Sequence, residues 1–196
     1  MSRAPKHRDA IVKAALTLFR RRGYSGTGLN DIVAQSGAPK GSVYHYFPAG
    51  KLAIAEAAVR QAAVNVARTL NELAMEHRTP GRIVRAYGAL LAGWMAKSRF
   101  RDGGPITTTV LETAPGDARV TAAAREAFRI WREPIVSRLV ERGVPASRAD
   151  RLGVLVIAAM EGSLIQARVE QNGSVIESTA RELELLLDGV TTGVKR

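Results

Sequence analysis

The sequence contains no cysteine, and it holds only three histidines among its 196 residues. The absence of cysteine excludes disulfides, thiolate metal ligands and thiol nucleophiles. His7, His45 and His77 fall in three different predicted helices or helix ends, so they do not form a two-histidine metal motif, and no glycine-rich phosphate loop is present. An enzyme is therefore a poor interpretation, and the sequence predicts neither a metal site nor a cofactor.

Long apolar runs are also missing. No uninterrupted stretch reaches 18 apolar residues, and the polar first residues continue directly into a predicted helix. We therefore expect a soluble, cytoplasmic protein that does not insert into a membrane. Its net charge is +11, and residues 1–51 hold nine lysines and arginines against two acids, Asp9 and Asp31. Such a basic end attracts polyanions, whereas a generic basic protein would spread its charge more evenly.

Residues 27–51 read TGLNDIVAQSGAPKGSVYHYFPAGK, which is the pattern of a helix-turn-helix. Residues 31–35 fit a short helix, residues 36–39 fit a tight turn, and residues 40–47 fit a second helix. A DNA major groove admits one α-helix, whose exposed polar side chains read base edges while a cation finds phosphates. The outer side of the second helix carries such groups: Lys40, Ser42, Tyr44 and His45.

The same segment resembles the DNA-binding domain of the TetR family of bacterial transcriptional regulators. The resemblance is carried by Thr27, Asp31-Ile32, Gly37, Lys40-Gly41-Ser42, Val43-Tyr44-His45-Tyr46-Phe47 and Lys51. It implies a homodimeric repressor that binds a palindromic operator and is released by a small apolar or aromatic effector. The alternative is a DNA-binding dimer without an effector, either constitutive or regulated by a protein partner. The residues expected to contact DNA are Thr27, Lys40, Gly41, Ser42, Tyr44, His45 and Lys51.

Nearly every other segment also has helical periodicity, so we expect an all-α fold of about nine helices. A first helix predicted over residues 7–22 would complete a three-helix DNA-binding domain over residues 1–50. Residues 51–196 are expected to form a helical domain that binds the effector and dimerises. Pro134 falls inside the apolar stripe of the seventh predicted helix, where it removes one backbone hydrogen bond. The helix is therefore expected to kink there or to divide into two.

The last two predicted helices are strongly apolar. The eighth, over residues 148–170, is apolar on more than one face, and the ninth carries a continuous apolar stripe. Both could fill a core within the chain. TetR-like proteins instead use their last two helices to pair with a second copy, and a dimer would place two recognition helices about 34 to 36 Å apart on DNA. The residues expected at that interface are Leu164, Ala167, Ile176, Leu183 and Leu187.

The middle helices contain most of the bulky flat side chains. Each such residue belongs to a core more often than to a pocket, but the resemblance implies a ligand chamber enclosed by the fourth to eighth helices. The residues expected to contact the effector are Tyr87, Trp94, Thr108, Glu112, Phe128, Trp131 and Met160.

A finer resemblance concerns the second half of the chain. Gly103-Gly104-Pro105, Leu111-Glu112, Trp131 and Glu161-Gly162 are similar to the LmrA/YxaF-like branch of the TetR family. That branch usually has cysteine where Gly104 stands here. Any effector contact that the cysteine would make is therefore missing from this chain.

Overall fold

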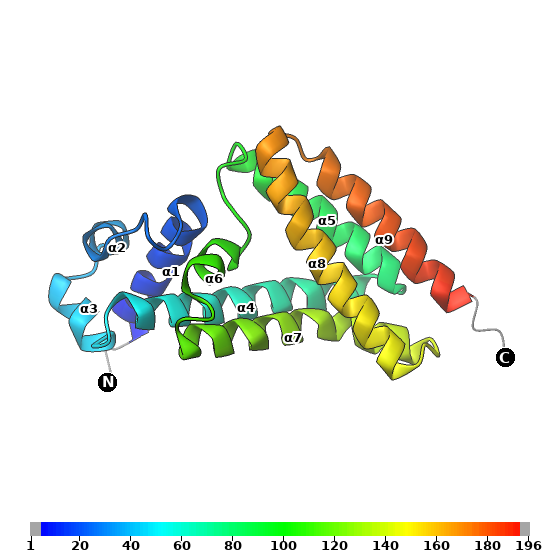
Figure 1. Cartoon of the computed structure of the whole chain (residues 1–196), viewed down its shortest axis with the longest axis horizontal. Helices are drawn as coiled ribbons and strands as arrows, with labels where there is room; N and C mark the ends of the chain where they lie inside the picture. The colour runs from blue at the N-terminus through cyan, green and yellow to red at the C-terminus, as the bar shows by residue number, and fades with distance from the viewer. Residues whose placement is uncertain (1–4, 193–196) are drawn as a thin grey trace. The chain divides into compact units, whose positions relative to one another are not determined.

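The computed structural model describes residues 5–192, and within that range it consists of nine α-helices and no β-strand (Figure 1). This confirms the predicted all-α fold. The helices are α1 (Pro5–Arg22), α2 (Leu29–Ser36), α3 (Lys40–Tyr46), α4 (Lys51–Glu76), α5 (Pro80–Lys97), α6 (Thr107–Thr113), α7 (Ala118–Glu141), α8 (Ala146–Glu170) and α9 (Ser174–Thr192).

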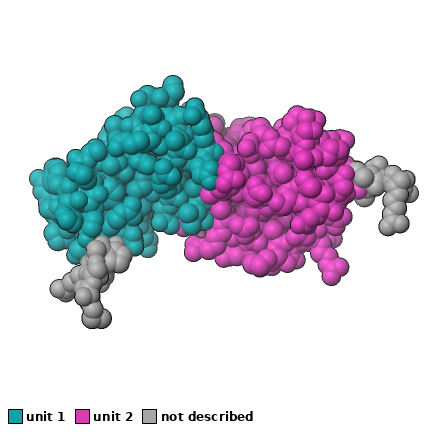
Figure 2. Space-filling view, turned by 90° about the horizontal axis from the view of Figure 1, so that it is seen from below, with its two compact units in different colours: residues 1–64, 104–127 teal, residues 65–103, 128–196 magenta. Residues whose placement is uncertain are grey.

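The chain divides into two compact units, which Figure 2 shows in different colours. The first unit contains the residues up to 64 together with residues 104–127, and the second contains residues 65–103 and those from 128 onward. Two of the three boundaries fall inside α4 and α7, so these two continuous helices each contribute to both units, and the third falls in the loop between α5 and α6.

The first unit has its core around α1. The apolar residues of α1 recur with helical spacing, so Ile11, Ala15 and Phe19 share one face and are buried. Helices α2 and α3 pack against α1 and contribute Ile32 and Val43 to the same core. Burial of these side chains holds the two short helices in place, because helices of fewer than about 12 residues are marginal alone.

The second unit is built on close packing of α5 against α9, with α8 beside them (Figure 1). Gly88 of α5 lies against the Cβ atom of Ala180 of α9, where a larger residue would collide. The Asp188 carboxylate of α9 also caps the start of α5, since it accepts hydrogen bonds from the Thr79 hydroxyl and the Gly81 amide, both at 3.2 Å. The inward face of α9 therefore packs against other helices of the same chain.

Helix α7 runs without interruption from Ala118 to Glu141 although it contains Pro134. The predicted division into two helices therefore does not occur. Trp131, Ile135 and Leu139 lie on the same side of α7 and are buried. Their burial offsets the backbone hydrogen bond that the proline removes.

Candidate functional site

Helix α3 has a polar outer face, and its apolar inner face is buried in the first unit. The turn before it contains Gly37, whose left-handed φ of 63° ends α2, and α3 begins after Pro39. Val43 and Phe47 face inward and are buried. The outward side contains Lys40, Gly41, Tyr44 and His45, which are exposed, and Ser42, which is half-buried. The side chains predicted to read DNA from this helix therefore share one accessible face.

The side chain of Thr27, a residue expected to contact DNA, is engaged within the chain. Its side chain is completely buried, and its hydroxyl donates a hydrogen bond of 2.8 Å to the Gly23 carbonyl. Gly23 ends α1 with a left-handed φ of 77°. Thr27 therefore closes the turn between α1 and α2 and does not present its hydroxyl to a DNA phosphate.

Lys51 also acts on this turn. Its ammonium group donates to the carbonyl oxygens of Tyr24 at 3.1 Å and Thr27 at 3.0 Å, and it lies 4.1 Å from the centre of the Tyr24 ring. An ammonium over an aromatic face adds a cation–π attraction to the two hydrogen bonds. These contacts engage the charge that was predicted to bind a phosphate, so Lys51 joins the start of α4 to the α1–α2 turn.

Helix α6 supplies the third support of the same turn. The Glu112 carboxylate accepts hydrogen bonds from the amides of Tyr24 at 3.0 Å and Ser25 at 2.6 Å. The Thr108 hydroxyl donates to the Phe19 carbonyl at 2.8 Å. Glu112 and Thr108 were predicted to contact an effector, and the structure instead directs both to the end of α1.

Hydrogen bonding from Ser25 lowers the pKa of the Glu112 carboxyl below its ordinary value, and the nearby Lys51 charge acts in the same direction. Burial opposes this shift, but its effect on the pKa is smaller. Glu112 is therefore a carboxylate at neutral pH, as its two amide contacts require. A side chain at Gly23 would collide with this carboxylate, so glycine is needed there both for its backbone angle and for the space.

The other five residues predicted to bind an effector lie in the second unit. Tyr87, Trp131 and Met160 are buried in its core. The ring of Phe128 is half-buried and meets Trp131 edge to face, with the ring centres 5.7 Å apart. Trp94 differs from them because 38% of it is exposed. Only Trp94 and Phe128 of this group are thus accessible from the surface of the chain.

The five residues predicted at a dimer interface are all buried within the single chain: Leu164, Ala167, Ile176, Leu183 and Leu187. They face the intrachain core, so they add little apolar surface for a second copy to cover. The exposed apolar side chains of α8 and α9 are different ones: Val154, Leu155, Ile165, Val169, Leu185 and Leu186. By length and composition α8 could cross a membrane, but core helices of soluble proteins meet the same criterion.

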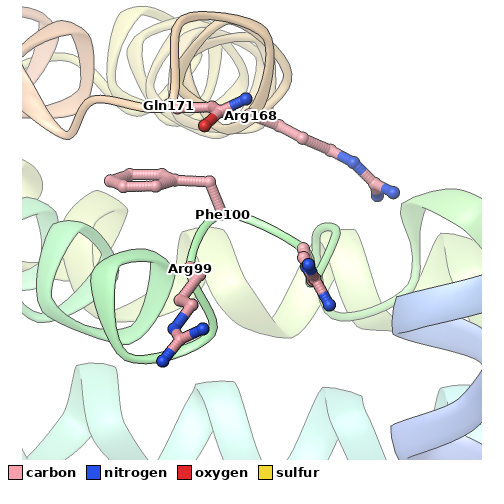
Figure 3. A pocket seen from close by; sticks show the side chains of 5 residues that line it. Arg99, Phe100, Arg168 and Gln171 are labelled. Carbon is pink, nitrogen blue, oxygen red and sulfur yellow. The ribbon is translucent and has the colours of Figure 1, made fainter.

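A pocket of about 330 Å³ opens on the second unit, between the end of α8 and the loop after α5. It is lined by Arg99, Phe100, Arg101, Arg168 and Gln171. Figure 3 shows Gln171 and Arg168 on one side and the loop with Arg99 and Phe100 on the other. None of these five is among the seven residues expected to contact the effector, and no motif or periodicity in the sequence brings the two segments together.

Comparison with known proteins identifies the family. Residues 11–58 match the family of bacterial regulatory proteins described as the tetR family, and residues 80–182 match the C-terminal domain described as transcriptional regulator LmrA/YxaF-like. An HTH-type transcriptional regulator of Mycobacterium tuberculosis is 32% identical over 185 residues, which cover 92% of this chain and 93% of that protein. This chain belongs to the TetR family of transcriptional regulators.

The LmrA/YxaF-like resemblance is confirmed as well. The HTH-type transcriptional regulator LmrA of Bacillus subtilis is 30% identical over 167 residues, which cover 85% of this chain and 89% of LmrA. The crystal structure of the regulatory protein TetR from Rhodobacter sphaeroides has the same fold, with a TM-score of 0.79 at 22% identity over 90% of this chain and 96% of that one. These relatives are named as regulators and not as enzymes, so this TetR-family chain is a DNA-binding transcriptional regulator.

Proposed function

We propose that this regulator is a cytoplasmic repressor that binds a palindromic operator as a homodimer and is released by a small apolar or aromatic molecule. The proposal that α3 contacts DNA is supported by the outer face of this helix, where Lys40, Gly41, Tyr44 and His45 are exposed and Ser42 is half-buried. A repressor needs no further active surface, because occupancy of an operator by itself blocks access to a promoter. We also propose that residues 1–50 bind DNA and that residues 51–196 bind the effector and dimerise.

The experiment that tests operator recognition starts from duplexes selected by the wild-type protein out of a random pool. Tyr44→Ala removes a side chain that is 55% exposed on α3, so it should weaken binding to the selected duplex without changing the fold. Lys40→Ala should weaken binding to all duplexes and flatten the salt dependence by about one unit. Wild-type affinity for both variants would overturn the assignment of α3.

The proposed dimer rests on the exposed apolar residues of α8 and α9. Val154, Ile165 and Val169 recur at helical spacing, and a Cβ atom at Gly162 would meet no neighbour within 4 Å. A glycine with open space beside exposed apolar residues permits close approach of another helix. A second copy related by a two-fold axis would cover the same surface on both chains, and it would pair the two α3 helices on a palindrome.

Effector control is proposed for the second unit, where Trp94 and Phe128 are accessible and Trp131 lies behind Phe128. Helix α4 belongs to both units, so a ligand that shifts its second half also displaces the half that follows α3. A coupling of about 1 to 3 kcal/mol, or 5 to 150-fold, suffices for regulation, and it is reciprocal.

Tryptophan fluorescence measures this coupling. An effector from a screened set of aromatic compounds should quench the emission, and it should bind more weakly when the selected operator duplex is present. Equal affinities with and without the duplex would favour the alternative, in which the protein is a DNA-binding dimer controlled by a protein partner or not controlled at all.

A further inference from the structure

Left-handed backbone conformations are distributed unevenly among the described residues. Four of them are glycines at chain reversals: Gly23, Gly37, Gly50 and Gly143. Three others carry side chains: Arg99 with φ 54°, Phe100 with φ 57° and Gln171 with φ 51°. All three of these side-chain residues line the same pocket, the one between the loop after α5 and the end of α8.

Glycine would suit these three positions better if stability alone were concerned. Gln171 is the C-cap of α8 and its amide donates to the Ala167 carbonyl, while Phe100 follows the end of α5 and its amide donates to the Met95 carbonyl at 2.8 Å. Helix ends of this kind favour glycine, because a Cβ atom is crowded in the left-handed region. Strained residues that persist at one place often mark a ligand site.

The charge around the pocket is also unbalanced. Arg99, Arg101 and Arg168 line it, and within residues 5–192 their guanidinium groups make no hydrogen bond or ion pair. Arginines with a structural role behave differently in this chain: Arg138 donates to the Ala74 carbonyl at 2.9 Å. The unpaired charges of Arg101 and Arg168 at one pocket repel each other, and a bound anion would relieve this repulsion.

The volume of the pocket and its lining residues other than arginine restrict which anions could bind there. Its volume of about 330 Å³ lies at the lower end of the range for small-molecule sites. In Figure 3 the side chain of Arg168 extends from α8 on the side away from the Phe100 ring, and the side chain of Arg99 points away from α8 on the other side of the loop. The Phe100 ring offers a flat apolar wall on the side of Gln171, whose amide can donate or accept a hydrogen bond.

We propose that this pocket binds a small organic anion, a carboxylate or phosphate ester attached to a flat apolar body. Arg168 and Arg101 bind the anionic group, Phe100 packs against the flat body, and Gln171 donates or accepts at its edge. The site is additional to the proposed function, because none of the residues proposed to contact the effector lines it.

The test uses three probes that share one ring system: 2-naphthoate, 2-naphthyl phosphate and the neutral 2-naphthamide. Isothermal titration with the full-length protein should show that both anions bind at least about tenfold more tightly than the amide. Tighter binding of the carboxylate or of the phosphate then identifies which anion the site prefers. Equal affinities for the amide and both anions would overturn the proposal.

The matched variants are Arg168→Gln and Arg148→Gln, which remove the same charge from the two ends of α8. Both arginines are exposed, but only Arg168 lines the pocket. Arg168→Gln should weaken binding of 2-naphthoate about tenfold, and Arg148→Gln should leave it unchanged. The same weakening in both variants would show general charge attraction and would contradict a site.

Gln171→Gly separates a binding role from a structural one. Removal of the side chain relieves the left-handed strain, so the melting temperature should rise by about 1 to 3 °C. The same variant should bind 2-naphthoate several-fold more weakly, because the pocket loses one wall. A higher melting temperature with unchanged affinity would mean that Gln171 only ends α8, and the role assigned to it would be wrong.

Discussion

The turn between α1 and α2 differs from the outer surface of α8. Polar and charged side chains at the turn have partners within the chain, whereas apolar side chains on α8 are left exposed. In the turn, the Lys51 ammonium, the Glu112 carboxylate and the Thr27 hydroxyl all bind backbone groups of residues 23–27. On α8, Ile165 is 54% exposed and Val169 is 78% exposed. Nothing within the described chain covers them.

This difference shows where contacts with other molecules are to be sought. Charged residues beside the DNA-binding helices attract attention in the sequence, yet Lys51 and Glu112 are already engaged within the chain. Within residues 5–192, the exposed apolar residues of α8, such as Ile165 and Val169, and the Arg168 guanidinium at its end have no such partners. Exposed apolar patches on a folded protein mark surfaces that other molecules cover, so α8 is a better guide to partners than the turn is.

The largest expected effect, on dimerisation and DNA binding, is that of a substitution on the exposed face of α8. Ile165→Glu places a carboxylate in the proposed interface, where an unpaired buried charge costs several kcal/mol. The variant should be a folded monomer in light scattering, and it should lose more than about 100-fold in affinity for the selected duplex, because one half-site binds weakly. A dimer of unchanged stability would place the interface elsewhere.

Leu183→Glu is the matched control, since Leu183 is buried within the chain between α9 and its neighbours. The same charge at this position should destabilise the fold itself, by about 3 kcal/mol or more. Circular dichroism during heating distinguishes the two outcomes, because Ile165→Glu should keep its melting temperature as a monomer whereas Leu183→Glu should not.

The next largest effect is expected at the turn between α1 and α2. Lys51→Ala removes two hydrogen bonds from a charged donor, so the free energy of unfolding should fall by about 2 kcal/mol. Denaturant titration measures this loss. Lys40→Ala is the control, because Lys40 is exposed on α3 and should change DNA binding but not stability. If Lys51→Ala kept full stability and only flattened the salt dependence of DNA binding, Lys51 would contact phosphate as the sequence suggested.

Glu112→Gln should have a smaller effect, about 1 kcal/mol, because the carboxylate is largely exposed and solvent screens its charge. The pKa of Glu112 is lowered in the folded state, so its contribution to stability is fully present above the ordinary pKa of a glutamate carboxyl and is lost as the pH falls through the lower, folded-state pKa. The variant should therefore lose less stability than the wild type on acidification below that pH. Glu182→Gln, an exposed carboxyl on α9 without such contacts, should keep the wild-type profile.

The smallest expected effect is that of Arg168→Gln on stability. Its guanidinium has no partner in the part of the chain that the structure describes, so the free energy of unfolding should change by less than about 0.5 kcal/mol. Denaturant titration beside the wild type is sufficient. A loss of 1 kcal/mol or more would mean that Arg168 stabilises the end of α8. The contrast between the outer surface of α8 and the α1–α2 turn would then weaken.

Prediction from sequence succeeded where the signal is local. The helix-turn-helix spans only about 20 residues, and the apolar side chains that anchor α3, such as Val43 and Phe47, alternate with exposed ones at helical spacing. Burial pattern and turn chemistry can be read from such a segment without knowledge of the rest of the chain. The number of helices followed in the same way from the apolar period and its breaks.

The roles of Thr27, Lys51 and Glu112 could not be read in that way. Glu112 meets Tyr24 and Ser25 across nearly 90 residues of sequence, and no pattern in either segment indicates the contact. Pro134 is a related case, since it predicted a kink or a division of the helix in two, and the division does not occur because the neighbouring apolar residues are packed in the core. A charged residue near a DNA-binding motif is therefore ambiguous until its partners are known.

The sequence by itself determined the helical fold, the family and the helix-turn-helix, because helical period, turn residues and motif spacing are properties of short segments. Only the tertiary structure decided which side of α8 and α9 faces inward, that three side chains bind the α1–α2 turn, and that arginines without a partner among residues 5–192 line one pocket. The physical reason is that an apolar or charged residue looks the same in the sequence whether it packs or pairs within the chain or stays exposed to solvent. The difference depends on which distant segment packs against it.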